Sequence, residues 1–372
     1  MKSILINGVS AKSGGGKSIL TNFLTSIKHK EIDLKYIVIV PPNHNYEKFK
    51  NENVIIIPFN DNKFSGIAQL YFYFVYVKKI IKRYSIELVF NLSDVIIPHN
   101  TKQLFLFDWP YGVYPESSVW QKMPFFEFCY RKFKLFLFKN SVRFPITIYA
   151  QTLSVRERLN RLYTIDKIGI LPNAVSIDNI EGGVYKDFMF PENRTKFLCL
   201  SKYYVHKNIE IFLPLARLIK QNNLAYSIII TIEKSQHRNA KKLLETIIEE
   251  KLENIIINVG AIDMEHVPSL YKQVDALLLP TLLESFSGTY VEAMHHLKPI
   301  FTSDMDFAKD VCGEAAIYFN ALNADEVFNA IKQFSDESLM KEMISAGEKR
   351  LGTFLSWEDV SDRILNEIKR NI

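Results

Sequence analysis

The stretch "DALLLPTLLESFSGTYVEAMHHLKPIFTS", residues 275–303, decides the fold class of the chain. Two short apolar runs, "ALLLP" and "PIFTS", have the length and composition of buried β-strands. Between them lie a polar loop and a segment of helical periodicity that opens near "SFSGTY". A strand, a loop, a helix and a second strand in this order form the repeating unit of a parallel α/β sheet. The loop is therefore expected at the carboxyl edge of the sheet, where open α/β folds bind ligands.

This loop has the chemistry of an anion site flanked by two carboxylates. The backbone N–H groups of Ser287, Gly288 and Thr289 can point toward an anion, and the helix N-terminus adds partial positive charge. Gly288 has no Cβ to block the close approach of a phosphate. Glu284 precedes the helix and Glu292 lies in its second turn, and carboxylates there are good acceptors for sugar hydroxyls. The loop suits a ligand with a diphosphate in its middle and a sugar at each end.

Short β-branched runs alternate with helix-length amphipathic segments along the rest of the chain. The strand candidates are "SILING", "YIVIVP", "VIIIPF", "ELVFNL", "QLFLF", "TIYAQ" and "KIGILPN" in the first half, then "KFLCLS", "YSIIITI", "NIIINVG", "DALLLP", "KPIFTS" and "AAIYF" in the second. Nearly continuous apolar strands that alternate with helices predict parallel sheets covered on both faces. We therefore predict the α/β class, with two doubly wound, Rossmann-like domains that face each other across a cleft.

The domain boundary is expected near residues 176–196, where Gly182-Gly183, a proline and polar residues break the pattern. This places a first domain at 1–180 and a second at 181–355. The last segment, 356–372, reads as a helix capped by Ser356, with acidic residues in its first turn.

Composition restricts the class of protein. Apolar residues make up 48% of the 372 residues and charged residues 23%, as in folded globular proteins. The three cysteines (Cys129, Cys199 and Cys312) are widely spaced, which fits a reducing compartment without disulfides or a zinc site. The N-terminus reads as a first strand rather than a signal peptide, and the apolar run 67–77 is too short to span a bilayer. We therefore expect a cytoplasmic protein.

The charge is divided unevenly. Residues 1–180 carry a net charge of +11 and residues 181–372 one of −6. A basic first half favours an anionic partner, although compositional drift is an equal alternative. Two basic, aromatic segments, 71–84 and 120–144, could lie at a membrane interface at the inner face of the cell membrane. The alternative is that both are helices that cover the sheet with long basic side chains. We expect peripheral contact with an anionic membrane rather than binding to nucleic acid.

The second half resembles a known family. The pattern "ESFSGTYVE" followed by "AM" and "KPIFTS" is similar to the E-x7-E signature of retaining glycosyltransferases of family four (glycosyltransferase group 1), which have the GT-B fold. "ILPNAVSID", "LSKYYVHKNIEIFLPLARLI", "NVGAIDMEHVPSLYKQVDALLLPT" and the final "SWEDV" resemble further family segments in the right order. The resemblance covers nearly the whole chain and is strongest over 197–320. It implies transfer of a sugar from a nucleotide-diphosphate sugar to a hydroxyl acceptor with retention, and a C-terminal helix that packs back on the first domain.

The resemblance also implies roles for single residues. Glu292 would bind the ribose of the donor and Glu284 the transferred sugar. The backbone of Ser287–Thr289 and the side chain of Lys207 would hold the diphosphate. Further donor contacts would come from Lys202, which stands where the family usually has Arg, and from Gly260 and Ala261 in the base-binding loop. The donor would be a UDP or GDP sugar, with no metal and no other cofactor, since the sequence contains no metal-binding cluster. The acceptor could be lipid-linked, as in surface polysaccharide or glycolipid assembly.

The glycine-rich stretch "AKSGGGKS", residues 11–18, allows two interpretations. It comes close to a phosphate-binding P-loop that ends in Gly16-Lys17-Ser18. A P-loop also needs a carboxylate for Mg²⁺ at the end of another strand, and Asp108 in "LFLFD" could supply it. However, the first position of the P-loop motif is occupied by Ala11 rather than glycine. The P-loop interpretation also does not explain the sequence pattern of the second half. We favour the family's first loop, with close backbone approach to the donor at Gly14, Gly15 and Gly16.

"LFDWPYGVYPESSVW", residues 106–120, occupies the region where the family often has a histidine that faces the reacting sugar. Asp108 would take that catalytic place, or else cap the next turn. Trp109, Tyr111 and Tyr114 follow, and their aromatic faces suit an acceptor sugar or a prenyl-type chain. Rival interpretations of the whole chain are a P-loop NTPase, a sugar-nucleotide epimerase of the same fold, and a binding module without turnover.

Overall fold

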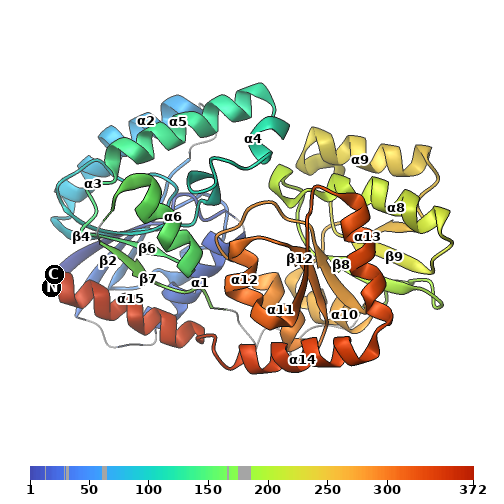
Figure 1. Cartoon of the computed structure of the whole chain (residues 1–372). Coiled ribbons are helices and arrows are strands. Elements are labelled where there is room, and N and C mark those ends of the chain that lie inside the picture. The colour runs from blue at the N-terminus through green and yellow to red at the C-terminus, as the bar shows by residue number, and fades with distance from the viewer. Residues whose placement is uncertain (13, 29, 31–32, 61–64, 166, 175–185) are drawn as a thin grey trace. The chain divides into compact units, whose positions relative to one another are not determined.

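The structure is a computed structural model that describes residues 1–12, 14–28, 30, 33–60, 65–165, 167–174 and 186–372 (Figure 1). Two compact units are present. Unit 1 contains residues 1–115, 123–174 and 355–372, and unit 2 contains residues 116–122 and 175–354. The chain therefore passes from one unit to the other four times. The boundary predicted at Gly182-Gly183 lies outside the described residues.

Unit 1 is built on a parallel sheet with strand order β3-β2-β1-β4-β5-β6-β7. Its strands are β1 (Lys2–Asn7), β2 (Leu34–Val40), β3 (Val54–Pro58), β4 (Ile86–Asn91), β5 (Lys102–Leu106), β6 (Thr147–Ala150) and β7 (Ile168–Ile170). Its longer helical segments are α1 (Gly14–Lys28), α2 (Ser65–Tyr71), a π-helical turn (Phe72–Tyr76), α3 (Val77–Arg83), α5 (Phe125–Ser141), α6 (Leu153–Tyr163) and α15 (Trp357–Asn371).

The strands of unit 1 are apolar on both sides because both faces are covered. Ile4 and Ile6 of β1 point to one face, where α1 and α15 complete the core. Leu5 between them points to the other face, toward the π-helical turn and α3. Successive side chains of a strand alternate between faces, so a sheet buried on both faces requires continuous apolar runs.

Helix α15 confirms the predicted capped helix at the end of the chain. Ser356 accepts a hydrogen bond from the Asp359 N–H at 3.1 Å, and Asp359 accepts one from the Ser356 N–H at 3.1 Å, which forms a capping box. Four side chains of α15 at helical spacing are at most 4% exposed and pack in the core that also contains α1: Val360, Ile364, Leu365 and Ile368. The helix thus forms part of the core of unit 1 rather than a peripheral tail.

Unit 2 contains a second parallel sheet, with strand order β10-β9-β8-β11-β12-β13. Its strands are β8 (Thr195–Cys199), β9 (Tyr226–Ile230), β10 (Ile256–Asn258), β11 (Ala276–Leu279), β12 (Ile300–Ser303) and β13 (Ala316–Phe319). Its helices are α4 (Val119–Lys122), α8 (Phe212–Gln221), α9 (Arg238–Glu249), α10 (Val267–Lys272), α11 (Gly288–His295), α12 (Asp306–Cys312), α13 (Ala324–Lys332) and α14 (Glu337–Leu351). The predicted α/β class with two doubly wound parallel sheets is confirmed.

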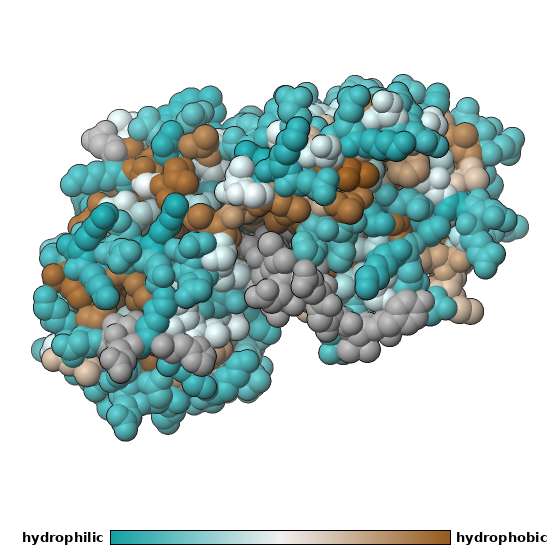
Figure 2. Space-filling model, turned by 90° about the horizontal axis from the view of Figure 1, so that it is seen from below, coloured by the Kyte–Doolittle hydropathy of each residue, from teal (hydrophilic) through white to brown (hydrophobic). Residues whose placement is uncertain are grey.

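The surface is polar where helices lie over the sheets. Figure 2 shows the side of the molecule on which α14 and α15 are drawn in Figure 1. Hydrophilic residues predominate on this side, and apolar residues form small patches. Among the described residues, no helix has the length and apolar character needed to cross a bilayer.

Candidate active site

The predicted site residues of unit 2 follow the carboxyl ends of three of its strands. Lys202 and Lys207 come after β8, Gly260 comes after β10, and Glu284 comes after β11. Since every strand pair of this sheet is parallel, these ends meet at one edge. The topology therefore places the dispersed residues of the sequence pattern at a common edge.

The closest contact in this group is an ion pair between Lys207 and Glu284. The Lys207 ammonium donates to Oε1 of Glu284, and the two side chains are 13% and 12% exposed. Lys207 ends the short 3₁₀ turn η4 (Val205–Lys207), which is fixed to the loop that carries Glu284. The Leu282 N–H donates to the His206 carbonyl oxygen at 2.8 Å. A positive and a negative group are thus held together in a site largely screened from water.

Asn208 anchors the same turn from its other side. Its backbone is left-handed, with φ 55°, a conformation that asparagine tolerates better than most residues. Its Nδ2 donates to the Ala321 carbonyl oxygen at 2.7 Å, and its Oδ1 accepts from Lys122 Nζ at 2.6 Å. Lys122 belongs to α4, the segment of the first half that is part of unit 2. The turn that holds Lys207 is therefore braced by three separate parts of the chain.

Helix α11 begins at the predicted anion site. Ser287 occupies its N-cap position, yet the Ser287 side chain makes no capping hydrogen bond. The first N–H groups of a helix have no acceptor within the helix, and they carry partial positive charge. An N-terminus without a side-chain cap, formed at Gly288 and Thr289, can offer these donors to an anionic ligand.

Glu292 lies in the second turn of α11, as predicted, and its side chain is partly buried. Burial raises the pKa of its carboxyl group to about 7, while a hydrogen bond from Tyr271 acts in the opposite direction. The Tyr271 side chain is fully buried, its hydroxyl also reaches the Thr289 carbonyl oxygen at 3.2 Å, and its ring stacks on His296. Tyr271 therefore fixes the position of Glu292 against the first turn of the helix.

The remaining donor-side predictions lie on more open surface. Lys202 is exposed, and in the described residues no ion pair joins it to Glu284. Gly260 has φ +74°, which strains any residue with a side chain, and its N–H faces Asn258 Oδ1 at 3.3 Å. Ala261 next to it is exposed. These residues have the accessibility that a ligand contact requires.

In unit 1 the structure brings the glycine-rich loop next to Asp108. Helix α1 begins at Gly14, and a Cβ on Gly15 or Gly16 would lie 3.9 or 3.8 Å from Asp108 Oδ2. A carboxylate therefore already lies beside the positive end of α1. A P-loop with Asp108 as its Mg²⁺ carboxylate would show the same proximity, so this contact agrees with both interpretations of the glycine-rich stretch.

The three aromatic residues predicted on the acceptor side are buried in unit 1. Trp109 is 6%, Tyr111 3% and Tyr114 0% exposed. One ring face of Tyr111 is covered by the guanidinium of Arg131 at 3.7 Å, and one face of Tyr114 by that of Arg158 at 4.0 Å. Burial and the two arginines show how these rings pack, and their predicted contact with an acceptor stays a prediction.

Three residues of the site escaped the sequence analysis. Tyr271 and Asn208 act through contacts with residues that are distant in sequence, and no local sequence pattern predicts such contacts. Gln151 donates to Asp108 Oδ1 at 3.3 Å. It directly follows β6, so a search for polar residues at the carboxyl ends of strands would have found it.

Comparison with known proteins identifies the family of the second domain. Residues 186–350 match the family described as Glycosyl transferases group 1. These residues form a group 1 glycosyltransferase domain. This match contains the Lys207–Glu284 pair and all of α11, so the predicted resemblance to glycosyltransferase group 1 is confirmed for this domain.

Relatives of this glycosyltransferase extend over nearly its whole length. The O-antigen chain mannosyltransferase RfbU of Salmonella typhimurium is 24% identical over 332 residues, which cover 86% of this chain and 87% of that protein. The sucrose-phosphate synthase of Thermosynechococcus elongatus has a TM-score of 0.79 at 13% identity and covers 100% of this chain and 99% of its own. HepE of Anabaena, solved in complex with UDP and glucose, has a TM-score of 0.72 at 14% identity, with 100% of both chains covered. The two structures share the fold of this glycosyltransferase.

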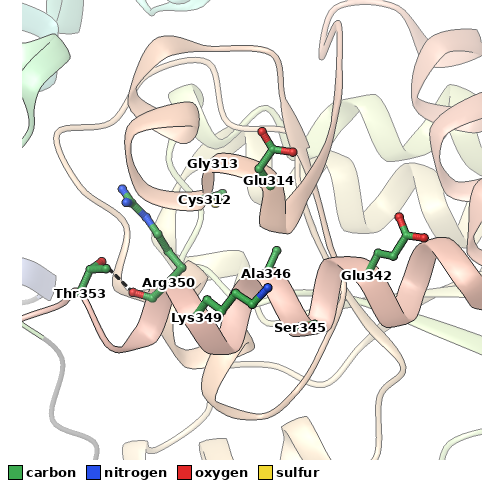
Figure 3. Close-up of a pocket in the computed structure, with 9 residues that line it drawn as sticks. All are labelled: Cys312, Gly313, Glu314, Glu342, Ser345, Ala346, Lys349, Arg350 and Thr353. Carbon is green, nitrogen blue, oxygen red and sulfur yellow. Dashed lines mark hydrogen bonds between the residues drawn. The ribbon is translucent and has the colours of Figure 1, made fainter.

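A separate pocket of the group 1 domain lies between the end of α12 and helix α14 (Figure 3). Arg350 on its wall donates Nε–H to the Val311 carbonyl oxygen at 3.0 Å, and Thr353 donates to the Arg350 carbonyl oxygen at 2.8 Å. Two acidic residues (Glu314 and Glu342) and two basic residues (Lys349 and Arg350) line it, and none of the predicted site residues does. Arg350 hydrogen-bonds a backbone carbonyl in the last turn of α12, so we assign it a structural role at the end of that helix.

Proposed function

We propose that this glycosyltransferase transfers a sugar from a nucleotide-diphosphate sugar to a hydroxyl acceptor with retention and without a metal ion. The observation that carries the proposal is the Lys207–Glu284 ion pair, held at the same sheet edge as the uncapped N-terminus of α11. An ammonium group and helix N–H donors suit a diphosphate, and a carboxylate suits the hydroxyls of the attached sugar.

In the proposed reaction the bond between C1 of the sugar and the diphosphate oxygen breaks. A bond from C1 to the acceptor oxygen forms on the same face, and the acceptor proton passes to the leaving diphosphate. Lys207, Lys202 and the N-terminus of α11 stabilise the negative charge that develops on the leaving group. Glu284 positions the sugar and Glu292 the ribose. The protein contributes electrostatics and positioning.

The relatives suggest the biological setting of the reaction. RfbU is described as acting on an O-antigen chain, and HepE was solved with UDP and glucose. We therefore propose a surface polysaccharide or glycolipid as the acceptor and a UDP or GDP sugar as the donor.

Calorimetric titration with UDP, GDP, ADP and ATP, each with and without Mg²⁺, tests the donor site. We expect one nucleoside diphosphate to bind without Mg²⁺ and to bind about tenfold or more weakly to Glu292→Ala, since a buried acceptor for ribose is lost. Tight Mg²⁺-dependent ATP binding that ignores Glu292 would instead support a P-loop NTPase. Conversion of the donor sugar without any acceptor would support an epimerase.

Lys17 provides an independent test of the glycine-rich loop. Its side chain is exposed, whereas a P-loop lysine must reach the phosphates of the nucleotide. We expect Lys17→Ala to change both nucleotide affinity and the rate of sugar transfer less than about twofold, within the usual range for surface substitutions. A large loss of nucleotide affinity in this variant would contradict the proposal.

We also propose that unit 1 contacts an anionic membrane through α5. Exposed residues follow one face of this helix at spacings of three and four: Phe125, Cys129, Lys132, Phe136 and Lys139. The exposed Arg143 lies just beyond its end. Helix α2 and the π-helical turn add the exposed Leu70, Tyr71, Phe74 and Val75, and Gln69 is tied to Tyr130 of α5 by a 2.6 Å hydrogen bond. Aromatic rings beside lysine and arginine on one face are typical of interfacial helices.

Not every basic residue of α5 belongs to this face. Lys134 is paired with Asp94 at 2.5 Å, and Arg131 with Glu127 at 2.7 Å. The inward face of α5 therefore agrees with the second interpretation of segment 120–144, in which the helix covers the sheet. Only the outward half is available to lipid headgroups.

Sedimentation with vesicles of phosphatidylglycerol and phosphatidylcholine tests the membrane proposal. We expect binding at low salt that weakens about tenfold in a Phe125→Ser, Phe126→Ser variant, because these side chains are 73% and 85% exposed and would enter the interface. Met264→Ser removes a similarly exposed apolar side chain from unit 2 and should bind like the wild type. Equal binding of the two variants, or no binding at low salt, contradicts the proposal.

A further inference from the structure

A buried hydroxyl joins the two loops that carry Lys207 and Glu284. Thr281 lies two residues after the end of β11, and its side chain is 1% exposed. Its Oγ1 donates to the His206 carbonyl oxygen at 3.2 Å and lies 3.4 Å from the Leu283 carbonyl oxygen. The first oxygen belongs to the turn after β8 and the second to the loop after β11. One hydroxyl therefore connects loops that follow two neighbouring strands.

The peptide group between His206 and Lys207 is held on both sides. Its carbonyl oxygen accepts from the Thr281 hydroxyl and also from the Leu282 N–H at 2.8 Å. Its N–H, which belongs to Lys207, donates to the Tyr204 carbonyl oxygen at 2.9 Å. A carbonyl oxygen has two lone pairs, so it accommodates both donors. The backbone that carries Lys207 is thus fixed independently of the ion pair that its side chain forms.

Thr281 itself is held by the next strand of the sheet. Ser303, the last residue of β12, is 1% exposed, and its hydroxyl donates to the Thr281 carbonyl oxygen. Strand β12 pairs with β11, and β11 pairs with β8. A chain of hydrogen bonds therefore runs from β12 through Thr281 to the turn that carries Lys207. Support from strands holds a functional side chain more precisely than a loop alone does.

Packing does not require a hydroxyl at this position. Valine has nearly the shape of threonine, and Leu282 and Leu283 beside Thr281 are apolar and buried. A buried hydroxyl costs free energy unless it is hydrogen-bonded. The Thr281 hydroxyl is therefore best explained by the carbonyl oxygen that it holds, which directly precedes Lys207.

We propose that Thr281 is a positioning residue for the transfer reaction and acts through the backbone of Lys207. The inference rests on the proposed function, in which the Lys207 ammonium stabilises the leaving diphosphate. When a diphosphate competes with Glu284 for that ammonium, the Thr281 hydroxyl keeps the lysine backbone in place, so little reorganisation is needed during the reaction. Without the hydroxyl, the His206 carbonyl oxygen loses one of the two donors that come from the loop of Glu284.

Thr281→Val tests the inference because it removes the hydroxyl and keeps the shape of the side chain. We expect this variant to bind nucleoside diphosphate about tenfold more weakly and to transfer sugar about tenfold more slowly, with the acceptor KM within about twofold of the wild type. Thr281→Ser retains the hydroxyl and should recover most of both losses. Affinity is measured by calorimetry, in which unfolded protein lowers the stoichiometry but not the affinity. Wild-type affinity and rate in Thr281→Val overturn the proposal.

Ser227→Ala serves as the control for a loss of stability. Ser227 is 0% exposed and lies near the amino end of β9, at the opposite edge of the sheet. Its hydroxyl accepts from Arg194 Nε at 2.8 Å and donates to the Asn254 carbonyl oxygen at 3.3 Å. At a temperature where the variant is folded, its nucleotide affinity and transfer rate should stay within about twofold of the wild type. Equal losses in the Ser227 and Thr281 variants would make the effect one of stability and overturn the proposal.

A double-mutant cycle with Lys207→Met shows whether the effect passes through Lys207. If it does, Thr281→Val should slow transfer less than about twofold further in the Lys207→Met background. A second loss as large as that in the wild-type background means that the hydroxyl acts elsewhere, and this refutes the inference alone. Wild-type transfer by Lys207→Met would refute the proposed role of the lysine, and the inference would fail with it.

Discussion

Lys207→Met is expected to lose sugar transfer by about 10²–10³-fold and to be destabilised by about 3–5 kcal/mol. The loss of activity follows because the proposed leaving diphosphate loses its principal cation. The loss of stability follows because Glu284, 12% exposed, keeps its charge without a partner. Adding Glu284→Gln should return most of the stability and none of the activity. Urea unfolding and initial transfer rates of the single and double variants measure the two effects separately.

The Lys134–Asp94 pair of unit 1 is the matched control for this prediction. Its lysine side chain is 10% exposed and its N–O distance is 2.5 Å. Lys134→Met should therefore also lower stability, while sugar transfer at a temperature where the variant is folded stays near the wild-type rate. If both lysine variants lose transfer equally, the effect of Lys207 is structural and its catalytic role is refuted.

Glu292→Gln is expected to be more stable than the wild type at pH 8 and to bind nucleoside diphosphate about tenfold to a hundredfold more weakly. Burial raises the pKa of Glu292 from 4.5 to about 7 in the folded protein. The folded state therefore holds its proton more tightly than the unfolded state. Its contribution to stability is full below pH 4.5 and is lost as the pH rises through 7, which amounts to about 3 kcal/mol at pH 8. Glutamine carries no charge and removes this cost.

The pH dependence distinguishes this explanation from a general gain in stability. The difference in unfolding free energy between Glu292→Gln and the wild type should shrink to below about 1 kcal/mol at pH 4.5, where the wild-type carboxyl is already protonated when folded. Glu253→Gln, which changes an exposed glutamate of the same unit, should match the wild type at both pH values. A stability difference that is constant with pH would argue against a raised pKa at Glu292.

Much of the fold could be predicted because its determinants are local. Each strand candidate of the sequence lies over an observed strand, with ends that differ by a few residues. The largest differences are at "KIGILPN", where only Ile168–Ile170 pair in the sheet, and at "NIIINVG", where only Ile256–Asn258 do. In the first of these, Leu171 still donates to the Ala150 carbonyl oxygen at 2.9 Å, and the pairing stops at Pro172, which has no N–H to donate. Periodicity indicates where a strand lies more reliably than where its pairing stops.

The site was predictable only in part, for a physical reason. Gly288, Glu284 and Glu292 belong to one strand-loop-helix unit, so their relation follows from sequence spacing. The contact of Lys207 with Glu284 depends on two strands that are distant in sequence but adjacent in the sheet. Tyr271 reaches Glu292 from another helix altogether. Side chains that act through such contacts have no spacing rule that would identify them.

The position of α15 has a consequence for how the protein is made. The ribosome releases the strands of unit 1 first, yet four side chains of its core belong to the last helix of the chain. Unit 2 is synthesised in between and, except for α4, is nearly continuous in sequence, so it can reach its native contacts before release. The unit whose strands are made first is therefore completed after unit 2. Until α15 has been synthesised, one apolar face of its nascent sheet is covered by α1 but lacks the side chains of α15. Chaperone binding to this face during synthesis, and aggregation of chains that stop before residue 356, are the expected results.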